Sequence, residues 1–247
     1  CESRPMTNDT HTPVLLIAGH WLGAWAWDDV LSHLREPRIS PTALTLPGLD
    51  DADPDRLNRT LEDQARAITD ALFHVDAPAV IVAHSGANAP VTLVLDRHPE
   101  LMQRVVWVDS GPIGDGSVFA PDLLTTLQDL PLPPFEQLAQ QASLEGLTPE
   151  TLDRFRSRAL SEPAGVLTAP AYLRNPARHT VPTTMVCCSI SSAQVQELVS
   201  AGHPMFAAVG ELTDAEWVDL PTGHWPMWSR PRELAEVITA ASLRRNG

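Results

Sequence analysis

The stretch "VIVAHSGANAP", residues 80–90, places a serine between a strand-like run and a helix-like run with almost no loop. Its first four residues suit a buried strand, and helical spacing begins at Gly86. A turn this sharp brings the two backbones close together, so the residues two before and two after Ser85 must be small; they are Ala83 and Ala87. The pattern predicts that Ser85 stands at the carboxyl end of a sheet and that the Gly86 amide begins a helix. The same letters also fit an ordinary turn in which Ser85 only caps the helix.

Apolar runs and helical patterns alternate on both sides of this stretch. We expect strands at 13–18, 41–46, 77–83, 104–109, 181–188 and 215–220. We expect helices at 24–35, 60–75, 86–100, 192–201 and 230–245. Thr60 and Asp63 form a capping-box pattern at the start of the second helix. The alternation predicts an α/β fold with a mostly parallel central sheet covered by helices on both faces.

Residues 112–180 break this rhythm. They are rich in proline, carry short amphipathic helices at 135–147 and 149–160, and show no evident strand. We expect this segment to form a small helical cap over one end of the sheet, with residues 13–111 and 181–247 as the core. Residues 1–12 are expected to lie outside the core, as a disordered or cloning-derived N-terminus with Met6 as the natural start.

Composition excludes several classes of function. The chain has 247 residues, 43% of them hydrophobic, which suffices for one large α/β domain. Its net charge is −14 and its basic residues, all arginine, are scattered, so no nucleic-acid partner is expected.

No apolar run reaches membrane-spanning length, and we expect no membrane partner. Cys187 and Cys188 stand together in an apolar stretch as core residues, which fits a reducing cytoplasm. No metal-ligand spacing occurs, and neither a metal nor another cofactor is expected. The oligomeric state stays open.

Two further motifs carry a family resemblance. The segment "IAGHWLGAWAWDDV", residues 17–30, and the segment "GHWPMWSRPRELA", residues 223–235, lie in the two parts of the proposed core. Together with residues 80–90 they resemble the α/β-hydrolase superfamily, especially its serine esterase and hydroxynitrile-lyase-like branch. The first segment is similar to the pattern HGAxxGAWxW, although Ala18 stands where that pattern has its histidine. The second is similar to the pattern GHxPxxxxPxELA.

The resemblance implies a role for each motif. It makes Ser85 the nucleophile and His224 the general base, and it makes the backbone N–H groups of His20 and Gly86 the two donors of an oxyanion hole. The His20 side chain could also reach the substrate, or it could be a purely structural histidine.

The third catalytic residue departs from the family pattern. The usual acid follows the strand at 181–188, but this chain has only serines there (Ser189, Ser191 and Ser192) before Glu197. Asp109 ends the strand that follows the Ser85 helix, and some members of the superfamily carry their acid at that position. We predict that Asp109 orients His224. In the alternative interpretation, Asp109 only caps the turn that follows it.

These residues predict hydrolysis of a small apolar carbonyl compound such as an ester, lactone or thioester. We expect the pocket to lie beneath the cap, with a bulky apolar wall. Its predicted lining residues are Trp21, Trp225, Trp228, Tyr172 and His179. Two alternatives remain open: a biosynthetic tailoring enzyme, such as a cyclase, thioesterase or C–C or cyanohydrin lyase, and a non-catalytic small-molecule binder on the same fold.

Overall fold

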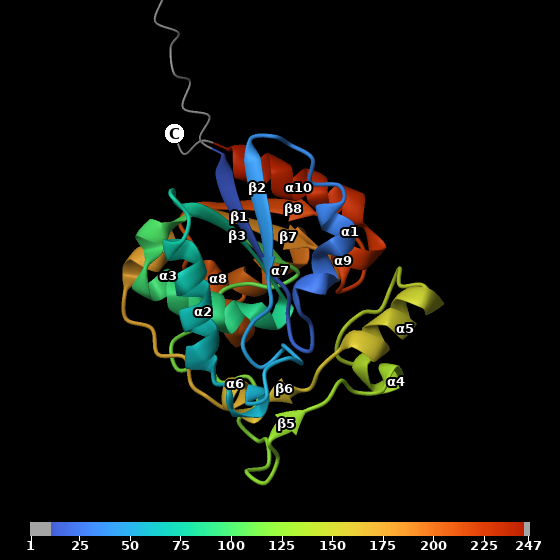
Figure 1. Cartoon of the computed structure of the whole chain (residues 1–247). Helices are drawn as coiled ribbons and strands as arrows, with labels where there is room; N and C mark the ends of the chain where they lie inside the picture. The colour runs from blue at the N-terminus through green and yellow to red at the C-terminus, as the bar shows by residue number, and fades with distance from the viewer. Residues whose placement is uncertain (1–10, 245–247) are drawn as a thin grey trace, which may run out of the picture.

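The computed structural model describes residues 11–244, which build a six-stranded sheet (Figure 1). Its strands are β1 (Thr12–Ile17), β2 (Ile39–Leu44), β3 (Ala79–His84), β4 (Met102–Val108), β7 (Thr183–Cys187) and β8 (Ala215–Asp219). The strand order is β2-β1-β3-β4-β7-β8, and every neighbouring pair is parallel. The predicted parallel α/β architecture is therefore confirmed. The core begins at Thr12, one residue earlier than predicted, and the expectation for residues 1–10 lies outside the described residues.

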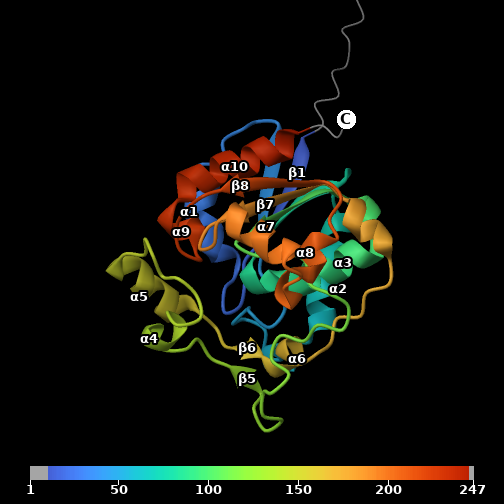
Figure 2. The same ribbon diagram turned by 180° about the vertical axis from the view of Figure 1, so that it is seen from behind.

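Helices cover both faces of the sheet, as Figures 1 and 2 show from opposite sides. One face carries α1 (Asp28–Leu31), α9 (Pro226–Ser229) and α10 (Pro231–Leu243). The other carries α2 (Leu61–Phe73), α3 (Asn88–Arg97), α7 (Ser192–Ser200) and α8 (Ala207–Gly210). Strand β1 shows why both faces need cover. Its Val14 and Leu16 side chains pack into the core on one face, while Leu15 and Ile17 pack into the core on the other.

The start of α2 forms as its sequence predicts. The Thr60 side chain accepts a hydrogen bond from the Asp63 amide at 3.2 Å, and the Asp63 carboxylate accepts one from the Thr60 amide at 2.9 Å. This reciprocal pair satisfies two N–H groups that a helix start otherwise leaves free.

Several elements differ in extent from their predictions. Strand β2 begins two residues earlier and includes Pro41, which pairs in register with Val14. Proline is tolerated there because β2 is an edge strand, whose outward N–H positions need no partner. The helix predicted at 24–35 is shorter, consisting of the 3₁₀ turn η1 (Ala24–Trp27) and α1.

Most of the segment 112–180 lies beyond the carboxyl ends of the sheet strands, and its last residues return beside α3 to the start of β7 (Figures 1 and 2). It contains α4 (Phe135–Leu138), α5 (Pro149–Arg158), α6 (Ala164–Leu167) and the 3₁₀ helix η5 (Pro176–Thr180). The expectation that it has no strand is wrong, because β5 (Asp129–Leu130) and β6 (Glu162–Pro163) pair antiparallel. Each is only two residues long, which is too short to produce a periodic signal in the sequence. The remaining 3₁₀ turns are η2 (Arg56–Asn58), η3 (Ser85–Ala87), η4 (Pro99–Leu101) and η6 (Pro204–Phe206).

The sheet topology decides where a site can form. After β1 the chain moves to β2 on one side of it, and after β3 it moves to β4 on the opposite side. The connections that leave the neighbouring strands β1 and β3 therefore run in opposite directions. Ligands of open α/β sheets bind at such a point, outside the carboxyl ends of the strands. Within residues 11–244, no helix has the length and apolar character needed to cross a membrane.

Candidate active site

Ser85 occupies the sharp turn between β3 and α3. Its φ of 50° lies in the left-handed region, which non-glycine residues rarely adopt. The flanking Ala83 and Ala87 are both buried, as the predicted tight packing of strand and helix requires. Gly19, after β1, approaches so closely that a Cβ atom there would lie 2.7 Å from the Ser85 Cβ and 3.0 Å from the Gly86 nitrogen. Only glycine permits this approach, and it sets the β1 loop directly against Ser85.

His224 stands in the loop after β8 and reaches Ser85 across the carboxyl edge of the sheet. Its Nε2 lies 2.7 Å from the Ser85 Oγ, within hydrogen-bond distance. The His224 amide donates to the Ser143 carbonyl at 2.8 Å, and a Cβ atom on Gly223 would lie 2.7 Å from that same oxygen. The loop that carries His224 is therefore held by close packing against the 112–180 segment.

Asp109 supplies a carboxylate to the other nitrogen of the His224 ring. Its Oδ2 lies 2.6 Å from His224 Nδ1, and its side chain is 2% exposed. Its Oδ1 accepts hydrogen bonds from the amides of Cys188 at 3.0 Å and Ser189 at 2.9 Å, while the Ser189 hydroxyl donates to Oδ2 at 2.5 Å. Burial by itself would raise the pKa of Asp109, but hydrogen bonds from His224 and Ser189 and the charge of His224 hold it below its ordinary value. The geometry thus favours an ionised Asp109 that fixes the orientation of the His224 ring.

Ser189 lies two residues after the end of β7, where the family resemblance predicts an acid, and its hydroxyl donates to the Asp109 carboxylate. The two serines that follow have other partners. Ser191 caps α7 through the Gln194 amide, and Ser192 binds the Asp219 carboxylate at 2.7 Å. Strand order alone does not distinguish Ser189 from Ser191 and Ser192, because it does not determine hydrogen-bond partners between loops.

His84, the last residue of β3 and the one before Ser85, connects the loop after β1 to the loop that carries His224. Its Nε2 lies 2.7 Å from the His224 carbonyl oxygen, and its Nδ1 accepts from the Gly19 amide at 3.3 Å. A carbonyl only accepts and an amide only donates, so these partners fix the neutral tautomer with the proton on Nε2. Burial lowers the pKa of His84 to about 3, with a further contribution from the charge of His224.

This depressed pKa predicts a pH-dependent stability. In the unfolded chain His84 binds a proton near pH 6.5, whereas in the folded chain it does so only near pH 3. The free energy of unfolding should therefore fall as the pH drops through this window, by up to about 1.4 kcal/mol per pH unit from His84 alone. Urea unfolding at pH 6.5 and 4.5 checks this, because His84→Gln should show a smaller loss between the two values than the unmodified chain. Equal losses in both proteins would contradict the assignment.

The predicted oxyanion donors lie at the junction of two loops. Gly86 begins the turn after Ser85, and His20 follows the glycine that touches Gly86. The backbone segments that carry these two N–H groups are therefore adjacent, as two donors to one oxygen must be. Their role in binding an oxyanion stays a prediction.

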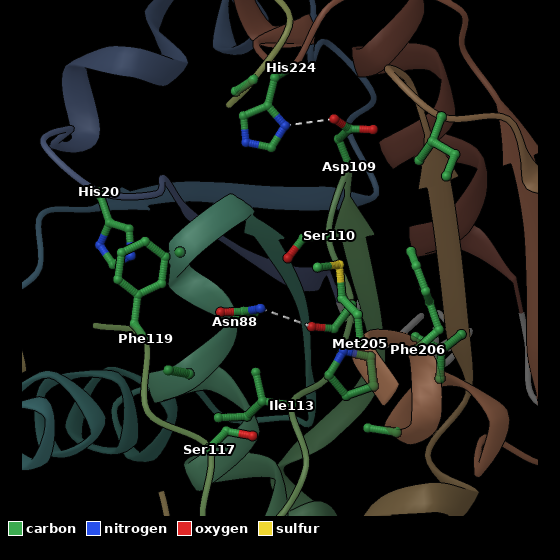
Figure 3. A pocket seen from close by; sticks show the side chains of 18 of the residues that line it. His20, Asn88, Asp109, Ser110, Ile113, Ser117, Phe119, Met205, Phe206 and His224 are labelled. Carbon is green, nitrogen blue, oxygen red and sulfur yellow. Dashed lines mark hydrogen bonds and ion pairs between the residues drawn. The ribbon is translucent and has the colours of Figure 1, made fainter. Parts of the chain in front are cut away.

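A cavity of about 1200 Å³ opens beside this arrangement (Figure 3). Asp109 and His224 lie at one side of it, while His20 lies at another with the Phe119 ring beside it. Asn88, from α3, donates to the Gly111 carbonyl at 3.2 Å on the cavity wall. Much of the remaining wall is apolar, including Ile113, Met185, Val209, Met205 and Phe206.

The predicted tryptophan wall needs correction, since none of the three tryptophans lines this cavity. Trp225 is 3% exposed and packs between His224 and Phe155 of α5. Trp228 donates to the Ala26 carbonyl at 3.1 Å from within the core. Trp21 donates through its ring to the Leu130 carbonyl at 3.0 Å, which ties the β1 loop to β5. Trp225 and Trp228 pack against Phe155 of α5, and Trp21 binds β5, so these rings are structural. The sequence does not show which elements contact them.

The other two predicted pocket residues also lie elsewhere. Tyr172 is 65% exposed and does not line the cavity. His179 pairs with Glu211 at 3.1 Å, away from the cavity wall. The 112–180 segment contributes other residues to the wall instead, such as Ser117, Phe119 and Leu144. Among the described residues, no three His, Cys, Asp or Glu side chains come together in a way that could hold a metal ion.

Comparison with known proteins supplies the family context. The sequence model of the family described as "Alpha/beta hydrolase family" matches residues 14–237. Putative methylesterase 14, chloroplastic, of Arabidopsis thaliana is 27% identical over 106 residues, which cover 41% of this chain and 30% of the relative. Esterase PIR7B of Oryza sativa subsp. japonica is 32% identical over 99 residues, 38% of this chain and 37% of the relative. The chain thus matches only about a third of the length of these curated relatives.

A solved structure extends the likeness across the whole fold. It is an extracellular alpha/beta-hydrolase from a Paenibacillus species, described as sharing structural and functional homology with Tobacco Salicylic Acid Binding Protein 2. Its TM-score is 0.75 at 19% sequence identity, covering 94% of this chain and all of that chain. At this identity the likeness establishes a shared fold.

Proposed function

This chain belongs to the alpha/beta hydrolase family, and from that premise we propose that it is a serine esterase with Ser85, His224 and Asp109 as its catalytic triad. One observation carries the proposal. Asp109 Oδ2, the two ring nitrogens of His224 and Ser85 Oγ form a continuous chain with separations of 2.6 and 2.7 Å. A carboxylate, an imidazole and a hydroxyl in this order are the parts of an activated nucleophile.

The geometry supports an acyl-enzyme mechanism. His224 Nε2 takes the proton of Ser85 as Oγ attacks the ester carbonyl carbon, while Asp109 stabilises the imidazolium that forms. The N–H groups of His20 and Gly86 stabilise the oxyanion. As the tetrahedral intermediate collapses, the C–O bond to the alcohol breaks and His224 returns the proton to the leaving oxygen. Water, deprotonated by His224, then attacks the acyl carbon and releases the acid and Ser85.

The cavity indicates the kind of ester. Its volume of about 1200 Å³ is large for the small substrate that the sequence suggested, because pockets for drug-sized ligands span roughly 300–1,000 Å³. No arginine is among the described residues that line it, so a neutral ester fits better than an anionic one. The names of the methylesterase relatives support a small alcohol group. We therefore favour a small-alcohol ester of a sizeable, largely apolar carboxylic acid, with the 112–180 segment as a cap over it.

Two assays test this function directly. A fluorophosphonate probe should label the protein once, at Ser85, because a triad activates one serine among many. Methyl esters of aryl-substituted carboxylic acids should be hydrolysed, as followed by release of the acid. Labelling at no residue, together with no ester hydrolysis, would favour the alternative of a non-catalytic binder.

A further inference from the structure

His20 forms part of the cavity wall beside Gly86, which has no side chain. Its ring lies over Gly86, so that a Cβ atom on Gly86 would be 2.3 Å from His20 Nε2. The imidazole therefore occupies space that any larger residue at position 86 would fill. Because Gly19, the preceding residue, lies against Ser85 and Gly86, the His20 ring stands close to the place where a scissile carbonyl must bind.

One side of the His20 ring faces a buried carboxylate from the 112–180 segment. Glu162 in β6 is 1% exposed, and its Oε2 lies 3.3 Å from His20 Nδ1. The same oxygen accepts the Trp21 amide at 3.3 Å, and Oε1 accepts the Gln64 side chain at 3.1 Å. These contacts fix the carboxylate in place. A carboxylate offers only acceptors, so the neutral His20 ring carries its proton on Nδ1 and a lone pair on Nε2.

The other side of the ring is without a partner. Nε2 is buried and makes no hydrogen bond to any described residue, and the side chain as a whole is 9% exposed. Buried polar atoms are nearly always hydrogen-bonded, so a lone pair left free on a cavity wall indicates a ligand. The ring beside it, Phe119 at 4.3 Å between centroids, is itself 58% exposed, so a bound molecule could displace it without opening the core.

We propose that His20 Nε2 accepts a hydrogen bond from the substrate, and that the preferred ester carries a hydroxyl or N–H group close to its scissile carbonyl. Glu162 is a positioning residue that sets the tautomer and orientation of His20. This assignment rests on the proposed esterase function and adds its substrate class. The preference for a donor follows from the lone pair on His20 Nε2, because an ester without a hydroxyl or N–H group leaves that atom without a hydrogen bond in the complex.

The test compares matched methyl esters of phenyl-substituted acids that carry a hydroxyl, a methoxy group or hydrogen at the α or β carbon. The unmodified protein should prefer one hydroxy ester over its methoxy partner by roughly 10- to 100-fold in kcat/KM, since loss of a buried hydrogen bond costs specificity of this order or more. His20→Phe should reduce that ratio to near one. His33→Phe, which replaces an exposed histidine outside the cavity, should leave it unchanged.

Glu162→Gln tests the positioning role. The amide of the new side chain can donate to Nδ1 and so permit the tautomer with a proton on Nε2, which should lower the hydroxyl preference. In a His20→Phe background, Glu162→Gln should not lower the hydroxyl preference further, because Glu162 acts on the substrate only through His20. General damage to the fold would lower kcat/KM for the hydroxy and methoxy esters alike, so it would not change the ratio between them.

Nitrogen NMR of the Ser85→Ala protein with ¹⁵N-labelled histidine gives a measurement independent of turnover and of the His20 variant. The His20 Nε2 resonance should move on adding the preferred hydroxy ester and not on adding its methoxy partner. Hydrolysis without any hydroxyl preference, a preference that survives His20→Phe, or an Nε2 resonance that ignores the hydroxy ester would each overturn the proposal. Absence of both fluorophosphonate labelling and ester hydrolysis in the unmodified protein would instead reject the esterase function on which it rests.

Discussion

Ser85→Ala should reduce ester hydrolysis by roughly 10⁵-fold or more in kcat, because removal of the nucleophile of a triad leaves only binding and oxyanion stabilisation. The fold should survive, since alanine is smaller than serine and enters the same left-handed turn at similar cost. Initial rates on the methyl esters and thermal unfolding of the same preparation check the two halves of this expectation.

A neighbouring serine provides the control for this variant. The Ser110 hydroxyl donates to the Ser85 carbonyl oxygen at 2.9 Å, and Ser110 lines the cavity together with His224. Ser110→Ala should keep activity within about tenfold, because it loses one hydrogen bond and no reacting atom. Near-normal turnover in Ser85→Ala would reject Ser85 as the nucleophile.

Asp109→Asn should lower kcat by roughly 10³- to 10⁴-fold, the loss typical of a triad whose orienting acid becomes an amide. The amide can donate to His224 Nδ1 and so stabilise the tautomer whose proton lies on Nε2, which then cannot accept the Ser85 proton. Steady-state kinetics on the best methyl ester measure this. A loss of less than about tenfold would favour the alternative in which Asp109 only holds its own turn.

A carboxylate returned to the end of β7 tests the same assignment from the other side. In an Asp109→Asn background, Ser189→Asp should recover part of the activity, because the Ser189 hydroxyl already reaches the Asp109 carboxylate beside His224. Ser192→Asp in that background is the matched control and should recover nothing, because the Ser192 side chain faces Asp219. Equal recovery, or none, in both double variants would mean that the end of β7 does not determine the acid position.

The sequence predicted those parts of the site that local patterns encode. Ser85 and His224 stand within motifs whose letters determine the turn and the loop, and Asp109 followed from its place at a strand end. His84, Ser189 and Glu162 were missed, because each acts on a residue more than sixty positions away through a hydrogen bond between loops or an ion pair. The direction of a side chain is equally hard to read. Trp225 and Trp228 closely follow His224 in the sequence, yet both turn into the core, where Phe155 of α5 contacts both rings.

The fold class was predictable for a related reason. Alternating apolar runs of strand length and helices of ordinary length indicate a parallel sheet whatever the details of the loops. The short pairing of β5 with β6 is braced by Trp21 in the β1 loop and has no comparable local pattern.

The strand order has a consequence for how this protein folds. Ser85 and Asp109 follow neighbouring central strands, but His224 follows β8 at the far edge of the sheet, 139 residues after Ser85 in the chain. Closing so long a loop costs entropy that only a nearly complete sheet can offset, and such long-range contacts form slowly. In the proposed mechanism, Ser85 therefore lacks its base until the last strand has docked. A chain still being synthesised would then lack a reactive serine hydroxyl, so reactivity and completion of the fold arise in the same step.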